Sequence, residues 1–233
     1  MREPLRIAVA QPSCVSYDVA ANASTHAEAV RSAGARVVVF PELSLTGYEL
    51  DAPPVEPGDP RMAPIVEACA RTSSLALAGA PVAGDGGRSH IAMLAIDGGG
   101  GAVAYHKLCL GTAEAVRFSP GSGPAVVEVD GWRLGLAICK DTGVPREAAD
   151  TAALGMDAYV AGVLESAEDA AVPDERARRV AADHHVWVAI ASFAGSTGGY
   201  AKAAGRSGIW AAGGSVIARA GPEPGAVVRA TLA

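Results

Sequence analysis

Short apolar runs alternate with helical segments through much of this chain, and that alternation most constrains what it can fold into. The run RIAVAQ (residues 6–11) precedes a helical segment over roughly residues 18–33, which leads to RVVVF (36–40). A strand-helix-strand order of this kind is typical of α/β folds, in which helices cover a sheet. We therefore predict an α/β protein.

The remaining segments extend the pattern and add hairpins. Further helices are expected over residues 61–74, 145–155 and 174–185, with strands at 75–82, 158–163 and 186–192. Hairpins are expected at 90–108, where Gly98 to Gly101 form the turn, at 125–139 and at 208–221. Glycine-rich turns between strand-like runs favour antiparallel pairing. We therefore expect mixed sheets with helices on the outside.

Composition favours one globular domain over residues 1–233 that acts on a small molecule. Half of the residues are apolar, the formal net charge is −6, and no block of Lys and Arg occurs. A nucleic-acid partner or an anionic membrane surface would call for such a basic patch, so neither is expected. The apolar runs are too short to span a bilayer.

The cysteines and the N-terminal residues point to a reducing compartment. The first residues, MREPLRIAVAQPSC, contain no hydrophobic stretch of signal length, so we expect a cytoplasmic protein. The cysteines are scattered and form no CxxC pair, which favours free thiols over disulfides or a zinc site. They are Cys14, Cys69, Cys109 and Cys139.

Three apolar strands end in polar residues that a core does not require. VVVFPEL places Glu42 after one strand, VAYHKL places Lys107 at the end of another, and GLAIC places Cys139 at the end of a third. Strand ends are rigidly held while the adjoining loops leave room for substrate. A thiol could attack a carbonyl or nitrile carbon, with Glu42 taking its proton and Lys107 facing the oxygen that gains charge.

Each of these residues also has a structural interpretation. A cysteine at a buried strand end can be a small core residue, Glu42 can open a loop, and Lys107 can be solvated. The histidines offer a rival base, but their spacing singles out none of them for a Cys-His pair. They are His26, His90, His106, His184 and His185.

The chain resembles the nitrilase superfamily of carbon-nitrogen hydrolases. Its first strand ends in AVAQ, matching the family's Ala-x-x-Gln, and Asp18 and Asn22 follow four residues apart as in the family. VVFPELSLTGY resembles the segment that carries the base glutamate, here Glu42, and GAVAYHKLCL the one that carries the lysine, here Lys107. LGLAICKD resembles the nucleophile segment, which places the nucleophile at Cys139.

A further segment, EAVRFSPG, resembles the family's Glu-x-x-x-Phe-x-Pro-Gly, so the resemblance implies that Glu114 helps to position substrate and lysine. It also implies that the backbone N–H of Lys140 contributes to an oxyanion hole and that Asp141 braces the turn. The implied fold is a four-layer αββα sandwich with two mixed central sheets. The implied chemistry needs no metal or organic cofactor, and a homodimer or higher homo-oligomer is implied as well.

The segment after the nucleophile departs from the family pattern. Where many relatives read Tyr-Asp-x-Arg-Phe-Pro-Glu, this chain reads KDTGVPRE, with Gly143, Val144 and Arg146 in place of arginine, aromatic residue and glutamate. Cys109 stands where a histidine often follows the lysine. Substrate specificity therefore cannot be transferred from the best-known branches.

An amidase that works through a thioester acyl-enzyme and releases ammonia is the first hypothesis. The alternatives are an N-carbamoyl amidohydrolase, a nitrilase, or a non-catalytic binding or assembly module on the same fold. Loss of one of the three catalytic residues would mark the non-catalytic module, and all three are present. A doubly wound nucleotide-binding domain would require a glycine-rich turn after the first strand, where this chain has AQPSCVSYD.

Overall fold

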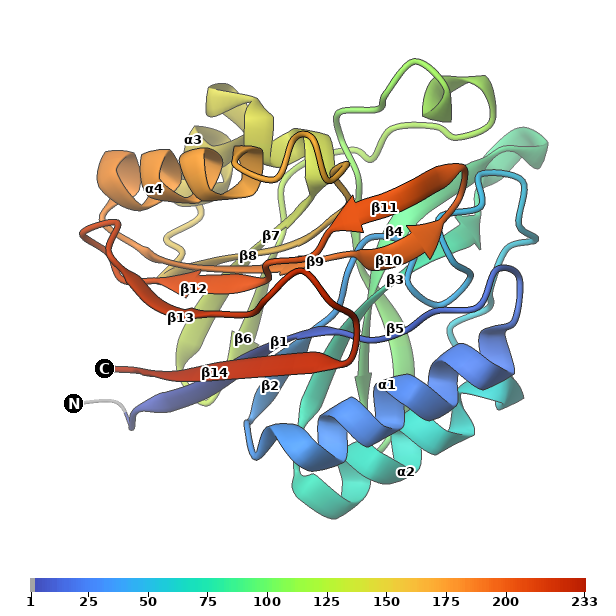
Figure 1. The fold of residues 1–233 in the computed structure, drawn as a ribbon, viewed down its shortest axis with the longest axis horizontal. Helices are drawn as coiled ribbons and strands as arrows, with labels where there is room; N and C mark the ends of the chain where they lie inside the picture. Colours follow the sequence, from blue (N-terminus) through green and yellow to red (C-terminus); the bar gives the residue numbers. More distant parts are fainter. Residues whose placement is uncertain (1–2) are drawn as a thin grey trace.

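Two six-stranded sheets lie face to face in the computed structural model, which describes residues 3–233 (Figure 1). The first sheet has the spatial order β14-β1-β2-β3-β4-β5. Its strands are β1 (Leu5–Gln11), β2 (Val37–Val39), β3 (Leu75–Ala83), β4 (Ser89–Asp97), β5 (Gly100–His106) and β14 (Ala226–Leu232). β1, β2 and β3 are parallel, whereas β4, β5 and β14 pair antiparallel with their neighbours.

The second sheet repeats this mixed arrangement in the order β13-β12-β9-β8-β7-β6. Its strands are β6 (Val126–Val129), β7 (Trp132–Ile138), β8 (Ala158–Val163), β9 (Trp187–Ser192), β12 (Gly208–Trp210) and β13 (Val216–Arg219). β7, β8 and β9 are parallel, and the outer strands are antiparallel. A separate two-stranded ribbon pairs β10 (Ala194–Thr197) with β11 (Tyr200–Ala204).

Helices cover the outer face of each sheet. α1 (Val19–Ala33) and α2 (Ala63–Thr72) lie on the first sheet, and α3 (Pro145–Ala153) and α4 (Val172–His184) lie on the second (Figure 1). Short 3₁₀ turns are η1 (Pro60–Met62), η2 (Asp85–Gly87), η3 (Glu114–Val116) and η4 (Cys139–Gly143). The four-layer αββα sandwich predicted from the resemblance is therefore confirmed.

Local chemistry explains where the first helix begins and ends. The Asp18 side chain accepts a hydrogen bond from the backbone N–H of Ala21, which satisfies a free donor of the first turn. Gly34 ends the helix in the left-handed conformation, with φ of 56°. Asn22 is fully buried, and its side-chain amide donates to the carbonyls of Val15 and Leu45. This amide ties the helix to the loop that carries Glu42.

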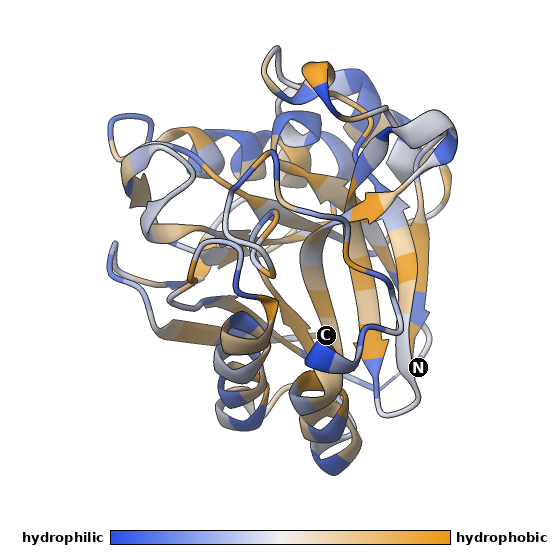
Figure 2. Cartoon of the chain, turned by 90° about the vertical axis from the view of Figure 1, so that its right-hand side faces the viewer, coloured by the Kyte–Doolittle hydropathy of each residue, from blue (hydrophilic) through white to orange (hydrophobic). Residues whose placement is uncertain are grey.

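The main hydrophobic core lies between the two sheets. It contains Ile7 and Val39 from the first sheet and Leu136 and Val160 from the second, all buried. Separate apolar clusters join each sheet to its own helices. Figure 2 shows apolar residues concentrated along the strands and hydrophilic residues along the outer helices. Among the described residues, no helix is long and apolar enough to cross a membrane.

Two features of the fold were not predicted. β14 closes the free side of β1 over seven paired residues, but its sequence AVVRATL mixes exposed and half-buried positions and gives a weak strand signal. The β10–β11 ribbon is also absent from the sequence interpretation, because alanine, glycine and threonine dominate it. The hairpins at 90–108, 125–139 and 208–221 are confirmed.

Candidate active site

The predicted site residues come together from both sheets. Glu42 follows β2, Lys107 follows β5 directly, Glu114 opens η3, and Cys139 follows β7 directly. The side chains of Glu42, Lys107 and Glu114 are almost fully buried, whereas Cys139 retains some exposure. Three charged groups buried in one place require mutual compensation, because an isolated buried charge is costly.

Two glycines let the backbone around Glu42 pass between the sheets. A Cβ on Gly79 of β3 would lie 2.3 Å from the backbone N of Leu43. On the other side, a Cβ on Gly162 of β8 would lie 2.6 Å from the carbonyl O of Phe40. Any larger residue at either position would displace this segment, so the two glycines fix the depth at which Glu42 sits.

Lys107 joins two carboxylates. Its Nζ lies 2.6 Å from Glu42 Oε1, 2.7 Å from Glu114 Oε1 and 2.8 Å from Glu114 Oε2. Burial acts to lower the pKa of Lys107, but the negative charges around it outweigh burial and raise that pKa. The lysine is therefore a fixed positive charge in the site, held by three charge-assisted hydrogen bonds.

Glu114 is stabilised as a carboxylate. Burial acts to raise its pKa, but Lys107, the Tyr48 hydroxyl and the backbone N–H of Gly111 together lower it. The Tyr48 hydroxyl donates to Glu114 Oε1 at 2.6 Å, and the Gly111 N–H donates to Oε2 at 2.6 Å. With both oxygens occupied, Glu114 is suited to hold Lys107 in place.

Glu42 differs from Glu114 in having an oxygen to spare. Its Oε2 is buried and makes no hydrogen bond to any described residue. Burial raises the pKa of Glu42 to about 7, against the lowering effect of Lys107. An unpaired acceptor in the interior is unusual and carries an energetic cost, so it calls for an explanation. The Cys139 thiol is close enough to lower the pKa of this carboxyl.

Cys139 begins η4 in a strained backbone conformation, with φ of 42°. A residue with a side chain adopts this left-handed region at a cost, and such strain is often found at functional sites. The Sγ atom lies 3.3 Å from the carbonyl O of Leu164. Burial and the charge of Glu42 raise the thiol pKa well above its ordinary value, although Lys107 acts to lower it. This raised pKa favours the protonated thiol over the thiolate.

Asp141 braces the turn that presents Cys139, as the sequence predicted. Its Oδ2 accepts hydrogen bonds from the backbone N–H of Ile138 at 3.0 Å and from the Tyr105 hydroxyl at 2.8 Å. Its Oδ1 accepts from the backbone N–H of Cys109 at 2.7 Å. The buried aspartate therefore connects the end of β7 with the loop after β5, which carries Lys107.

The remaining predicted positions lie around the same turn. The Lys140 side chain is exposed and its Nζ donates to the carbonyl of Leu110 at 2.7 Å. Arg146 is also exposed and pairs with Asp150. Gly143 faces the guanidinium of Arg176, which belongs to α4. The departures from the family pattern thus leave the three buried charged residues in contact.

Sequence reasoning missed two tyrosines at the site. Tyr48 supports Glu114 and packs edge-to-face on Tyr200 of β11, with ring centroids 5.8 Å apart. The backbone N–H of Tyr48 donates to the Thr197 hydroxyl of β10 at 2.9 Å. Tyr48 lies in the segment VVFPELSLTGY that was singled out for Glu42, but no pattern linked it to the later β10–β11 ribbon.

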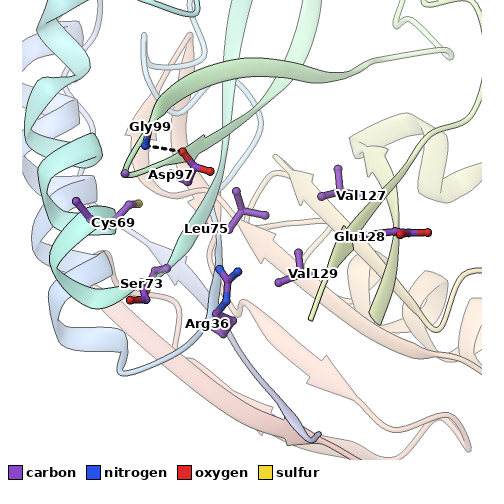
Figure 3. Close-up of a pocket in the computed structure, with 12 residues that line it drawn as sticks. Arg36, Cys69, Ser73, Leu75, Asp97, Gly99, Val127, Glu128 and Val129 are labelled. Carbon is purple, nitrogen blue, oxygen red and sulfur yellow. Dashed lines mark hydrogen bonds between the residues drawn. The ribbon is translucent and has the colours of Figure 1, made fainter. Parts of the chain in front are cut away.

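One surface groove lies away from these residues. This groove has a volume of about 510 Å³. Arg36, Cys69, Asp97 and Val129 are among the residues that line it (Figure 3). Arg36 precedes β2, whereas Glu42 follows it, so the groove and the buried charges lie at opposite ends of that strand. Within residues 3–233, no group of three or more His, Cys, Asp or Glu side chains has an arrangement that could hold a metal ion.

Comparisons with known proteins identify the family. A sequence model described as carbon-nitrogen hydrolase matches residues 6–233. The chain is 30% identical to the "Hydrolase in pqqF 5'region" of Pseudomonas protegens, an alignment that covers 96% of this chain and 81% of the relative.

Solved structures show the same fold. An alanine variant of the nitrilase-superfamily amidase from Nesterenkonia AN1 matches with a TM-score of 0.88 at 23% identity, over 98% of this chain and 90% of the other. Another structure of the amidase, a double mutant in complex with acrylamide, matches with a TM-score of 0.88 at 22% identity, over 99% and 91% of the two chains. With the sequence model matching residues 6–233, this chain belongs to the carbon-nitrogen hydrolase family.

Proposed function

We propose that the protein is an amidase in which Cys139 is the nucleophile, Glu42 the general base and acid, and Lys107 the cation that stabilises the oxyanion. The observation that carries the proposal is the buried Lys107 ammonium held between Glu42 and Glu114, beside a cysteine with φ of 42°. A purely structural ion pair would leave the free oxygen of Glu42 unexplained.

In the acylation step, Glu42 accepts the proton of the Cys139 thiol. Because the raised pKa favours the protonated thiol, its proton moves to Glu42 as Sγ attacks the amide carbon. The carbonyl oxygen gains negative charge and is stabilised by Lys107 Nζ and the backbone N–H of Lys140. Glu42 then gives the proton to the departing nitrogen, ammonia leaves, and a thioester to Cys139 remains.

The deacylation step reuses the same carboxylate. Glu42 removes a proton from water, which attacks the thioester carbon, and the proton then passes to the Cys139 sulfur as the acid departs. A base with a pKa of about 7 is half ionised near neutral pH and so can both accept and donate a proton there. Glu114 keeps Lys107 in position through both steps.

Small primary amides are the proposed substrates. The amidase from Nesterenkonia sp. AN1 has been solved in complex with acrylamide and with butyramide. In this chain Tyr48 and Tyr200 pack against each other near the buried charges, and aromatic side chains beside the site would favour a short apolar acyl group. A cytoplasmic location and a homodimer or higher homo-oligomer are also part of the proposal, and size-exclusion chromatography with light scattering tests the assembly.

The experiment that tests the proposal is ammonia release from a panel of substrates. The panel contains acetamide, propionamide, butyramide and acrylamide, together with N-carbamoyl amino acids and aliphatic nitriles, and compares wild type with Cys139→Ala. Hydrolysis of the amides by wild type alone supports the amidase. Preferred turnover of the carbamoyl compounds or nitriles would replace it with one of those activities, and no turnover of any compound would favour a non-catalytic module.

A further inference from the structure

An arginine from another element fills the space beside Gly143. A Cβ built on Gly143 would lie 3.1 Å from Cζ and 3.2 Å from Nε of Arg176, closer than ordinary van der Waals contact. Gly143 is the last residue of η4, the turn that begins with Cys139, while Arg176 lies on α4. A Cβ at position 143 would therefore crowd the guanidinium, which would have to shift by a few tenths of an ångström.

Arg176 contacts the turn through a chain of hydrogen bonds. Its Nη1 lies 3.4 Å from the Thr142 hydroxyl, and that hydroxyl donates to the carbonyl O of Cys139 at 2.6 Å. A second arginine of α4, Arg179, donates to the carbonyl of Thr142 at 2.5 Å. Consecutive hydrogen bonds of this kind polarise one another and hold the strained backbone of Cys139 in place.

The same guanidinium also reaches the segment on the other side of the thiol. Arg176 Nη1 lies 2.7 Å from Glu165 Oε1. Glu165 directly follows Leu164, whose carbonyl O is 3.3 Å from the Cys139 sulfur. Arg176 thus connects the turn that carries Cys139 with the segment that carries Leu164, whose carbonyl accepts the hydrogen bond of the thiol.

We propose that Arg176 is a positioning residue for Cys139, supplied from α4 in place of a side chain at position 143, and that it also neutralises Glu165 beside the thiol. The proposal rests on the proposed role of Cys139 as the nucleophile. It names a residue outside the sequence motifs and explains why glycine is present at position 143.

The charge of Glu165 makes the pH dependence of the Cys139 thiol a test of the proposal. If Arg176 had only a structural role, its removal would not change that pH dependence. Glu165 raises the pKa of the Cys139 thiol, and Arg176 compensates that negative charge. Removing only the arginine leaves the carboxylate facing the thiol without its partner. The thiol should then react at higher pH than in wild type, and removal of the carboxylate as well should reverse the change.

The test measures the rate at which iodoacetamide alkylates Cys139 as a function of pH, by peptide mapping, together with amide turnover. Arg176→Ala should slow alkylation by about tenfold at neutral pH and move the profile to higher pH by about one unit. Arg176→Ala with Glu165→Gln should return the profile towards that of wild type. Arg178→Ala is the matched control, because this neighbouring arginine pairs with Asp174 and the carbonyl of Gly214.

A second arm tests the shared volume. Gly143→Ala should slow alkylation in the wild-type background, where the new Cβ meets the guanidinium, and should have little further effect in Arg176→Ala, where that space is empty. Should Arg176→Ala fold poorly, Arg176→Lys tests the positioning role by itself, since it keeps the charge that neutralises Glu165 but loses the planar guanidinium. Arg176→Lys should lower turnover while leaving the pH profile unchanged.

Two results would overturn the inference. The first is an Arg176→Ala variant whose alkylation rate and amide turnover equal those of wild type. The second is that the effects of Gly143→Ala and Arg176→Ala on the alkylation rate are additive. Failure of the proposed function would look different. A wild-type protein that is alkylated at Cys139 but hydrolyses no compound of the panel would contradict the amidase, while the alkylation rates would still decide the role of Arg176.

Discussion

Lys107 Nζ lies 2.6 Å from Glu42 Oε1, although the two residues are 65 positions apart and follow different strands, β5 and β2. Both side chains are almost fully buried. Glu114 contacts the same ammonium, and the two carboxylates together stabilise the charged form of Lys107 although the side chain is buried. A fixed cation beside a carboxylate with one free oxygen is the central feature of the proposed mechanism.

Replacing Lys107 by alanine should remove both the oxyanion donor and the partner of two carboxylates. We expect turnover of the best amide to fall at least about 100-fold, because one oxyanion donor contributes about 3 kcal/mol. Unfolding free energy should fall by about 3–5 kcal/mol, since the carboxylates remain buried and unpaired. Lys202→Ala, which removes an exposed lysine, is the control. A folded Lys107→Ala protein that still releases ammonia would assign the oxyanion role elsewhere.

The pH dependence of activity should follow Glu42. Its pKa of about 7 is raised by burial, and only the ionised carboxylate can accept the thiol proton. We therefore expect kcat/KM to rise with pH through about pH 7 and to decline below it as Glu42 becomes protonated. Glu42→Gln should be inactive at every pH. A wild-type profile without an inflection near neutrality would contradict the assignment of Glu42 as the base.

Tyr48→Phe tests the support of Glu114. The substitution removes the hydroxyl that donates to Glu114 Oε1 at 2.6 Å, a bond to a charged group that contributes about 1.5–3 kcal/mol. We expect kcat/KM to fall by about tenfold or more, measured with the best amide. Tyr17→Phe is a suitable comparison, because its hydroxyl bonds to exposed carboxylates. Equal activity of the two variants would exclude a role for Tyr48.

Gly79→Ala and Gly162→Ala should displace the backbone that carries Glu42. Each new methyl group would meet backbone atoms at 2.3 Å or 2.6 Å, and such overpacking costs about 1–3 kcal/mol. We expect a lower melting temperature and reduced turnover in both variants. Gly58→Ala is the control, because nothing lies within 4 Å of its built Cβ. A Gly162→Ala variant with the melting temperature of wild type would contradict the prediction, because it would show that the backbone at Phe40 can shift to admit the methyl group.

Much of the fold could be predicted because apolar strands and capped helices leave strong local signals. The helix after Asp18 was predicted over roughly 18–33 and spans Val19–Ala33. The strand that ends at Cys139 was predicted from the apolar run GLAIC, and it is β7 (Trp132–Ile138). β14 was not predicted, because a half-exposed strand at a sheet edge lacks a continuous apolar run. Its pairing with β1 also joins opposite ends of the chain, which local sequence does not reveal.

The candidate site was predictable only in part. Glu42, Lys107 and Cys139 stand at strand ends, which is a local signal, and the family resemblance added Glu114. Tyr48 and Arg176 could not be found this way, because their contacts depend on how distant segments pack. Local sequence therefore indicated the candidate reacting groups, while tertiary packing determines which groups hold them.

The most direct test of the mechanism is to trap the acyl-enzyme. Wild-type protein is mixed with butyramide, quenched in acid during turnover, and analysed by mass spectrometry of the intact chain and of its peptides. The account predicts a butyryl group on the peptide that contains Cys139, absent from Cys139→Ala. Turnover without any acyl adduct on Cys139, or an adduct on another residue, would contradict it.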